Sequence, residues 1–482
     1  MLIDRPKTKI ICTLGPATSS DGIVQSLIEN GMSIARLNMS HGDLDEHSNA
    51  VKRVRRISEK LDTPVGIMVD VPGVKYRTGP LGTGILNLIP TDKITLTSRD
   101  VTGTTELVAV FPSGIHLDAR IGQPVLLDDG LIELRILDIQ QQDVQCEVIR
   151  GGRLTERRGV ALPGQTTSHQ FPDEQSIQAL IFAAKHNVDF VAISTVRNHL
   201  DITRAKEILI EYGHTNTHII SKIERSEAID NFSEILDVSD SIMVARGDMG
   251  VEIKLSQVPI VQKELIATCN AKGKPAITAT QMLESMLKSP VPTRAEVTDV
   301  ANSIYDGTDA IMLSGETSVG EYPVEAVKVM AEVAYATEAA LPYEKMIVEK
   351  RKQLLPKTDD AISYDACQTA QQLNASLIVA FTESGSTAGR VSKYRPRPPI
   401  LALTPDKEVQ RKLTIQWGVT PKTIRKVRDI NEFFAVGEEY AAQTGNWKTG
   451  SVVVLVAGLP IGVRGGTNLL RVLTFPSSSD PT

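Results

Sequence analysis

Residues 218–246, HIISKIERSEAIDNFSEILDVSDSIMVAR, contain two short apolar runs separated by a helix-like segment. The two runs, at 218–223 and 241–246, are almost continuously hydrophobic, which is typical of strands buried on both faces. Repeated strand–helix units predict a parallel sheet, and eight such units predict a closed (β/α)8 barrel. The other six runs are Lys9–Leu14, Ser33–Asn38, Val65–Val71, Asp189–Thr195, Pro275–Thr280 and Ala310–Ser314.

The interval between the third and fourth runs is too long for one strand-to-helix connection. About 120 residues separate Val71 from Asp189, whereas such connections usually contain about two to six. Segments such as TDKITLTS and VQCEVIRGG are strand-like and are separated by turn residues. We therefore predict that residues 74–170 form a small β-barrel lid domain, inserted into a catalytic barrel made of residues 1–73 and 171–343.

The pattern changes again after residue 340. Residues 341–357 are polar and contain two prolines, as expected of a connector. From about residue 358 the strand–helix alternation resumes, with apolar runs SLIVAFT, PILALTP and SVVVLVAG and a final strand near 469–475. Residues 344–482 are therefore predicted to form a C-terminal α/β regulatory domain with a parallel sheet.

The composition excludes several classes of protein. The net charge is −6 and only 4% of residues are aromatic, which argues against nucleic acid as a partner. No run reaches the about 18 apolar residues of a membrane helix, and the first residues lack the apolar core of a secretion signal. The four cysteines are scattered, so we expect a cytoplasmic protein without a disulfide framework.

Polar residues gather where seven of the eight predicted barrel strands end. One polar strand end can simply be solvated, but in a barrel of this type the ends meet at a single mouth, where active sites lie. Buried charges are costly unless they are paired or bound, so the ring predicts a charged ligand. Its members are Arg36, Asn38, Ser40, His41, Asp70, Ser194, Thr195, Arg197, Lys222, Glu224, Arg246, Asp248, Thr278, Thr280, Ser314 and Glu316.

The residue types in this ring indicate phosphoryl transfer. Glu224 and Asp248 could together hold a hard divalent cation, with water and substrate oxygens completing its shell. Arg36 and Lys222 would lie opposite and neutralise phosphate and carboxylate oxygens. A divalent cation with Lys and Arg around a phosphoryl group is found repeatedly in enzymes that transfer phosphoryl groups. The chain has no HExxH zinc motif and no GxxxxGK[ST] phosphate-binding loop. A nucleotide would therefore have to be bound by other residues.

Several long blocks of the sequence resemble those of pyruvate kinases, in the same order. They are KTKIICTLGPAT, ARLNMSHG, HIISKIE, IMVARGDMGVEI, TATQMLESM, PTRAEVTDVANSIYDGTDAIMLSGETSVGEYP and GGTNLLRV. The resemblance covers nearly the whole chain, and the inserted and C-terminal domains fall where that family has its lid and regulatory domains. It implies transfer of the phosphoryl group of phosphoenolpyruvate to ADP, which gives pyruvate and ATP in the last step of glycolysis. It also implies dependence on Mg2+ or Mn2+ and assembly into a homotetramer.

The resemblance implies a role for each residue that matches a family motif. Lys222 would stabilise the transferring phosphoryl group, Thr280 would lie where the enolate is protonated, and Arg36 would complete the catalytic group. Gly247 and Asp248 would also contact the substrate, and Glu224 and Asp248 would bind the divalent cation. The positions that contact ADP or ATP are Asn38, His41, Arg77 and Arg158, the last of which is usually lysine in the family.

One segment departs from the family pattern. Residues 70–77 read DVPGVKYR, where the family usually has DTKGPEIR. Lys75 thus replaces a glutamate that accompanies K+ dependence in the family, and an ammonium could supply the fixed charge that K+ otherwise supplies. The resemblance therefore implies that K+ is not required, although Lys75 could also point to solvent at the hinge. The positions that match K+ ligands are Asn38, Ser40, Asp70 and Val71.

A second candidate site lies in the predicted C-terminal domain. A loop at 382–387 follows an apolar strand and opens a helix, a place where backbone amides and hydroxyls can bind phosphate. It resembles the family's effector phosphate loop, although an ordinary turn with Ser and Thr caps would read the same. Glu383 weakens the prediction of a sugar-phosphate or nucleotide effector, and Arg390, Lys393, Arg395 and Arg397 favour it. The loop residues are Thr382, Ser384, Gly385, Ser386 and Thr387.

Two other functions remain open from the sequence. A barrel lyase or aldolase could use Mg2+ to stabilise an enolate without a nucleotide, but the inserted lid and Lys222 disfavour it. A catalytically silent effector-binding protein is the other alternative. The presence of Lys222, Glu224, Asp248 and Thr280 together argues against it.

Overall fold

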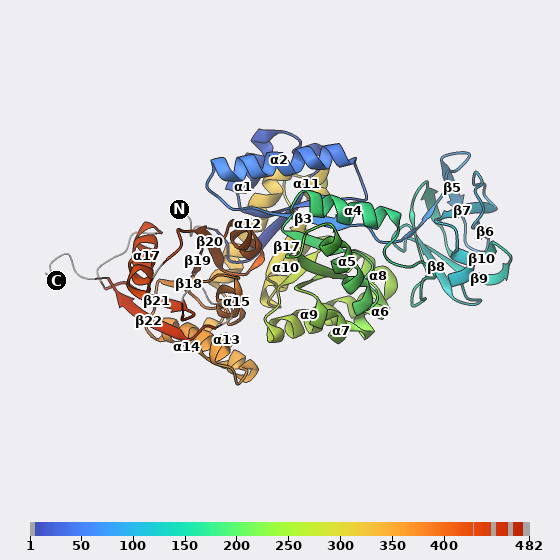
Figure 1. The fold of residues 1–482 in the computed structure, drawn as a ribbon. Coiled ribbons are helices and arrows are strands. Elements are labelled where there is room, and N and C mark those ends of the chain that lie inside the picture. The colour runs from blue at the N-terminus through green and yellow to red at the C-terminus, as the bar shows by residue number, and fades with distance from the viewer. Residues whose placement is uncertain (1–4, 428, 445–449, 461–465, 476–482) are drawn as a thin grey trace.

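The computed structural model describes residues 5–427, 429–444, 450–460 and 466–475, so the first glycine of GGTNLLRV lies outside the described residues. Eight parallel strands close into a barrel in the order β1-β17-β16-β15-β14-β13-β3-β2 (Figure 1). The predicted barrel and all eight of its strands are confirmed. Their bounds are β1 (Lys9–Thr13), β2 (Met32–Asn38), β3 (Gly66–Val71), β13 (Phe190–Ile193), β14 (His218–Ile223), β15 (Ser241–Ala245), β16 (Ala276–Ala279) and β17 (Ala310–Leu313).

The barrel is packed on both sides of its wall, because successive side chains of a strand point to opposite faces. One buried cluster fills the interior with at least one side chain from each of the eight strands, such as Ile11, Met68 and Met243. A larger cluster packs the outer face against helices. These include α1 (Asp21–Glu29), α2 (Leu44–Lys60), α4 (Glu174–Lys185), α5 (His199–Glu211), α9 (Val258–Lys272), α10 (Arg294–Tyr305) and α12 (Pro323–Ala339).

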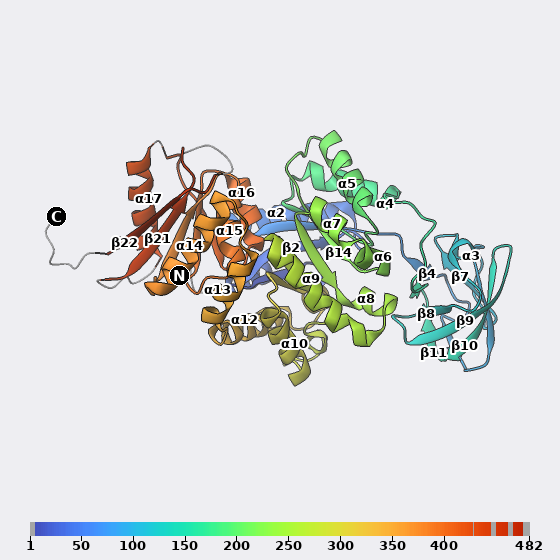
Figure 2. The same cartoon turned by 90° about the horizontal axis from the view of Figure 1, so that it is seen from below.

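The segment between β3 and β13 forms a second closed barrel with its own buried core. It lies at one end of the molecule, beyond the mouth of the large barrel, in both views (Figures 1 and 2). Its seven strands follow the order β10-β6-β7-β4-β12-β8-β9. Their bounds are β4 (Tyr76–Thr78), β6 (Lys93–Thr97), β7 (Leu107–Phe111), β8 (Pro124–Leu127), β9 (Ile132–Gln140), β10 (Asp143–Arg150) and β12 (Gly159–Ala161). We call this unit the lid.

The C-terminal part of the chain forms a five-stranded sheet at the opposite end of the molecule (Figure 2). Its strands are β18 (Leu377–Phe381), β19 (Ile400–Thr404), β20 (Val419–Thr423), β21 (Val452–Ala457) and β22 (Leu469–Thr474). The sheet is parallel except for β22, which pairs antiparallel to β21. The prediction of a parallel sheet is therefore wrong for this last strand, since it returns directly beside its predecessor. Helices α13 (Tyr343–Lys350), α14 (Thr358–Gln372), α15 (Ser386–Lys393), α16 (Lys407–Lys412) and α17 (Ile430–Gln443) complete this part.

A buried arginine joins the C-terminal part to the closed end of the large barrel. Arg395 donates to Asp309 Oδ1 at 2.7 Å and to Asn270 Oδ1 at 2.8 Å. Asp309 Oδ2 accepts the backbone N–H of Ala276, the first residue of β16, at 3.0 Å. The junction is therefore tied to a strand whose other end reaches the barrel mouth. Among the described residues, no helix combines the length and apolarity needed to span a membrane.

Candidate active site

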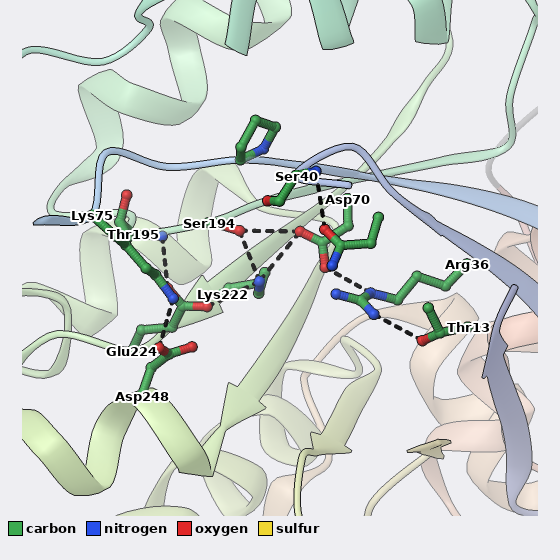
Figure 3. A network of polar contacts seen from close by, with 12 residues as sticks. Thr13, Arg36, Ser40, Asp70, Lys75, Ser194, Thr195, Lys222, Glu224 and Asp248 are labelled. Carbon is green, nitrogen blue, oxygen red and sulfur yellow. Dashed lines mark hydrogen bonds and ion pairs between the residues drawn. The ribbon is translucent and has the colours of Figure 1, made fainter. Parts of the chain in front are cut away.

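The predicted site residues come from neighbouring strand ends of the large barrel and converge at its mouth (Figure 3). Arg36 and Asp70 lie in β2 and β3, and Lys222 lies in β14. Glu224 follows β14 directly, and Asp248 lies in α8 (Arg246–Glu252), which begins where β15 ends. These five side chains therefore lie in or directly after β2, β3, β14 and β15, and the barrel brings them together, with β13 between β3 and β14.

Asp70 is the centre of a buried polar network. Its Oδ2 accepts from Arg36 Nε at 2.8 Å, and its Oδ1 accepts from Ser194 Oγ at 3.0 Å and Lys222 Nζ at 3.2 Å. Burial alone would raise the pKa of Asp70, but Lys222 and Arg36 lower it to about 2. Asp70 therefore stays ionised and fixes both cations, while Arg36 also donates to Thr13 Oγ1 at 2.8 Å.

Lys222 connects this network to the predicted metal ligands. Its Nζ lies 2.7 Å from Ser194 Oγ and 3.0 Å from Glu224 Oε1. The second oxygen of Glu224 accepts the backbone N–H of Thr195 at 3.0 Å. Thr195 has a φ of 52°, which is strained for a β-branched residue. This backbone geometry aims its N–H at Glu224, a contact that the sequence analysis missed.

Lys75 contacts the two predicted metal ligands. Its Nζ lies 2.6 Å from Asp248 Oδ1 and 3.6 Å from Glu224 Oε2. Burial would lower the pKa of Lys75, but Glu224 and Asp248 raise it above its usual value. Burial would likewise raise the pKa of Asp248, but Lys75, followed by Lys222, holds it below its usual value. Lys75 thus points into the site, not to solvent at the hinge.

The donor set fits a divalent cation of the Mg2+ type. Glu224 and Asp248 face one point, and Oε1 of Glu224 is buried there, with an ion pair to Lys222 at 3.0 Å but no hydrogen bond among the described residues. The same residues contain no group of three or more His, Cys, Asp or Glu side chains suited to a metal. Mg2+ is usually bound by one or two carboxylates, with waters and substrate oxygens completing its shell. The two carboxylates meet that requirement.

Thr280 and Gly247 lie together at the next strand end. Thr280 Oγ1 accepts the backbone N–H of Gly247 at 2.8 Å and donates to Ala279 O at 2.7 Å. Its φ of 68° places it in the left-handed region. Arg246 braces this conformation, because its Nη2 donates to Thr280 O at 2.8 Å and its Nη1 to Asp299 at 2.8 Å. The sequence analysis did not identify Asp299 as a site residue, because it resembles the many other acidic residues on helix surfaces.

The four predicted nucleotide residues fall into two groups. Asn38 ends β2 and His41 follows it, both at the mouth of the large barrel. Arg77 and Arg158 lie side by side on the lid, where Arg77 donates to Arg157 O at 3.1 Å. Arg158 Nη1 pairs with Asp128 at 3.4 Å. The barrel group and the lid group therefore belong to different structural units.

The positions that match K+ ligands also lie together. Asn38 and Asp70 are register partners on β2 and β3. Asn38 Oδ1 accepts the backbone N–H of Ser40 at 3.2 Å, and Val71 O accepts the N–H of Ser194 at 3.2 Å. Lys75 instead forms ion pairs with Glu224 and Asp248.

The predicted effector loop is a tight turn before α15. Thr382 Oγ1 accepts the N–H of Gly385 at 2.8 Å, and Gly385 has a φ of 90° that favours glycine. Ser384, Gly385 and Ser386 line a cavity of about 470 Å³ between this part and the large barrel. The basic residues that favoured an anion site are partly engaged elsewhere: Arg390 pairs with Asp359, Lys393 with Asp360 and Arg395 with Asp309.

Comparisons with known proteins agree over nearly the whole chain. Residues 5–327 match the family model for the barrel domain of pyruvate kinase, and residues 360–473 match that for its alpha/beta domain. A pyruvate kinase of Staphylococcus aureus strain USA300 is 44% identical over 468 residues, which are 97% of this chain and 80% of the relative. The relative from strain COL shows the same values. A crystal structure of a pyruvate kinase from Cryptosporidium parvum has a TM-score of 0.92 at 35% identity, and it covers 98% of this chain and 97% of that one.

Proposed function

This chain belongs to the pyruvate kinase family, and from that premise we propose how its barrel mouth transfers a phosphoryl group from phosphoenolpyruvate to ADP. The observation that carries the proposal is the convergence of Asp70, Lys222, Glu224 and Asp248 from strand ends on one side of the barrel mouth. The enzyme is a phosphotransferase of glycolysis, and pyruvate and ATP are its products. The bond from phosphorus to the enol oxygen breaks, and one from phosphorus to a terminal oxygen of ADP forms.

Each residue of the mouth has a defined task in this reaction. Lys222 binds the phosphoryl oxygens as they move, and Arg36 binds them from the other side of Asp70. Gly247 and Asp248 position the substrate, and Thr280 lies where the enolate accepts a proton to become pyruvate. Glu224 and Asp248 would hold Mg2+ or Mn2+. When bound, that cation supplies positive charge that stabilises the enolate.

We extend the proposal to the nucleotide. Asn38 and His41 on the large barrel and Arg77 and Arg158 on the lid bind ADP or ATP from two sides. Closure of the lid over the mouth would bring the two groups together and exclude water, so that the phosphoryl group reaches ADP. The same reasoning assigns residues 1–73 and 171–343 to catalysis, 74–170 to the lid and 344–482 to regulation.

We expect activity to require a divalent cation but not K+. In steady-state assays of pyruvate formation, chelation by EDTA should abolish turnover, and Mg2+ or Mn2+ should restore it. In buffer free of K+ and Na+, activity should nearly equal that with added K+, because Lys75 already supplies a fixed charge at the mouth. The variant Lys75→Glu should then become dependent on K+. A large stimulation of the unmodified enzyme by K+ would contradict this assignment.

We propose that a phosphorylated metabolite regulates the enzyme through the loop of Thr382, Ser384, Gly385, Ser386 and Thr387. Lys272, Lys274 and Lys412 line the same cavity as Ser384 to Ser386. The first of these lysines pairs with Asp237, and the other two donate to backbone carbonyls. A ligand phosphate would therefore meet positive charge that carboxylates only partly neutralise.

Glucose 6-phosphate and adenosine monophosphate are suitable probes of this site. We expect at least one of them to shift the saturation curve for phosphoenolpyruvate, while glucose and adenosine have no effect. Ser386→Asp should remove the shift, because it places a negative charge at the start of α15. A saturation curve that neither phosphate moves would contradict the effector assignment for these ligand classes.

The family also suggests assembly and location. We propose that the enzyme is a cytoplasmic homotetramer, and sedimentation equilibrium of the purified chain tests the tetramer directly. A monomer at assay concentration would contradict it. Fractionation of cells that express the chain tests its location.

A further inference from the structure

Lys75 lies where a divalent cation would bind. Its Nζ is 2.6 Å from Asp248 Oδ1 and 3.6 Å from Glu224 Oε2, between the two carboxylates proposed as metal ligands (Figure 3). Among the ion pairs of the described residues, Asp248 pairs only with Lys75. The two anions would repel one another without a cation between them. The ammonium of Lys75 therefore holds them in place.

We propose that Lys75 is an internal counter-ion that a divalent cation must displace, and that this displacement loosens the first connection between the large barrel and the lid. The inference rests on the metal site of the proposed function. A divalent cation binds carboxylate oxygens at about 2.1 Å and brings its own waters. It cannot share the space between Glu224 and Asp248 with an ammonium, so metal and Lys75 compete.

The position of Lys75 in the chain links this competition to the lid. Residues 72–75 connect Val71, the end of β3, to Tyr76, the start of β4 in the lid. Gly73 in this connection packs so closely on Thr195 that an added Cβ would lie 2.0 Å from its Oγ1. The ion pairs of Lys75 with Asp248 and Glu224 therefore tie the first connection to the barrel mouth.

The second connection is held by other residues. Arg225 Nη2 donates to Gln165 O at 2.6 Å, and Arg197 Nη1 donates to His169 O at 2.9 Å. Neither arginine forms an ion pair with Glu224 or Asp248 in the described structure. The first connection also has a tie that the metal would not break, because Ser176 Oγ donates to Pro72 O at 2.9 Å. Metal binding would therefore release the Lys75 end of the first connection and leave the second as a pivot.

The ammonium of Lys75, once displaced, has space to move to a new position. The side chain of Lys75 is 33% exposed, so its ammonium can move away from Asp248 without entering the hydrophobic core. Only three residues separate Lys75 from Val71, one of the positions that match K+ ligands. Release by the metal would thus deliver the ammonium to the place where a fixed monovalent charge is proposed to act.

Calorimetric titration with Mn2+, without substrates, tests the competition. We expect Lys75→Met to bind Mn2+ about 10-fold more tightly than the unmodified protein, because the competing charge is gone. Lys75→Arg keeps a charge there and should bind no more tightly than the unmodified protein. Lys254→Met removes a lysine six residues after Asp248 that has no ion pair among the described residues, and it should leave Mn2+ affinity unchanged. Glu224→Gln should lose most of the binding.

The outcomes separate this inference from the proposed metal site. Equal affinity in the unmodified protein and a folded Lys75→Met variant would overturn the competition, while loss of binding in Glu224→Gln would still support the site. Unchanged binding in Glu224→Gln would overturn the site and the inference with it. Circular dichroism checks that each variant folds. Amide hydrogen exchange of residues 73–76 should quicken when Mn2+ binds the unmodified protein, and it should be fast with or without Mn2+ in Lys75→Met. Exchange that Mn2+ leaves unchanged in both proteins would overturn the link to the lid.

Discussion

Replacing Lys222 with methionine is expected to lower turnover at least about 1000-fold, which corresponds to about 4 kcal/mol of lost transition-state stabilisation. The ammonium lies 2.7 Å from Ser194 Oγ, 3.0 Å from Glu224 Oε1 and 3.2 Å from Asp70 Oδ1. It is the cation that joins the arginine-bearing side of the mouth to the carboxylates proposed to bind metal. In its absence, charge that develops on the phosphoryl oxygens would have no ammonium to meet.

The loss should be in chemistry more than in folding. Removing one partner of a buried ion pair costs about 3 kcal/mol of stability, but Asp70 keeps its hydrogen bonds from Arg36 and Ser194. We therefore expect a folded variant, with a lower midpoint of thermal unfolding and an unchanged circular dichroism spectrum. Turnover measured by a coupled assay of pyruvate formation gives the catalytic effect separately.

A second buried lysine provides a matched control. Lys9 begins β1 at the opposite end of the barrel, where its Nζ donates to Val419 O at 2.6 Å. Burial, together with nearby Arg5, lowers the pKa of Lys9 to about 8. Lys9→Met removes a comparable buried ammonium far from the mouth, so its turnover should stay within about twofold of the unmodified enzyme. Near-normal turnover of Lys222→Met would remove Lys222 from its assigned role.

The strands of the large barrel could be predicted because their burial leaves a clear pattern. Strands covered on both faces are continuous apolar runs, and such runs mark all eight. The lid was predicted from the length of one interval. Strand β20 was not predicted, because Val419–Thr423 reads VTPKT, which is polar and contains a proline. Its pairing with β19 depends on the buried contacts of the folded sheet, which local sequence does not encode.

The sequence predicted which side chains gather at the barrel mouth, but not all the contacts between them. The barrel topology places Arg36 and Asp70 on neighbouring strands and Lys222 two strands beyond Asp70, so their proximity follows from the fold. The partner of Lys75 does not follow from it, because a hinge segment can direct a side chain in several directions. Arg390, Lys393 and Arg395 show a related limit. Their charges favoured an anion site, but three aspartates distant in sequence neutralise them.

Replacing Glu224 with glutamine is the second change with a large expected effect: we expect turnover to fall about 1000-fold at ordinary Mg2+ concentration. Glutamine keeps the shape of the side chain and can still accept the N–H of Thr195, which lies 3.0 Å from Glu224 Oε2. It loses the negative charge that faces Lys222 and Lys75. The mouth then has one carboxylate fewer for a divalent cation and the same number of ammonium groups.

The dependence of turnover on Mg2+ concentration distinguishes a lost metal ligand from general damage. If Glu224 binds the cation, Glu224→Gln should need far more Mg2+ for half-maximal activity, and part of its turnover should return at high Mg2+. Glu252→Gln is the matched control: this carboxylate lies in α8, as Asp248 does, and lines the same cavity under the lid as Glu224. Among the ion pairs of the described residues, Lys75 and Lys222 pair with Glu224 and not with Glu252, so replacing Glu252 by an amide should change little. A Glu224→Gln enzyme with the Mg2+ requirement of the unmodified protein would show that the cation binds elsewhere. If Glu224 is a ligand, its replacement must raise the Mg2+ concentration that is needed, whatever happens to Lys222 or Thr195.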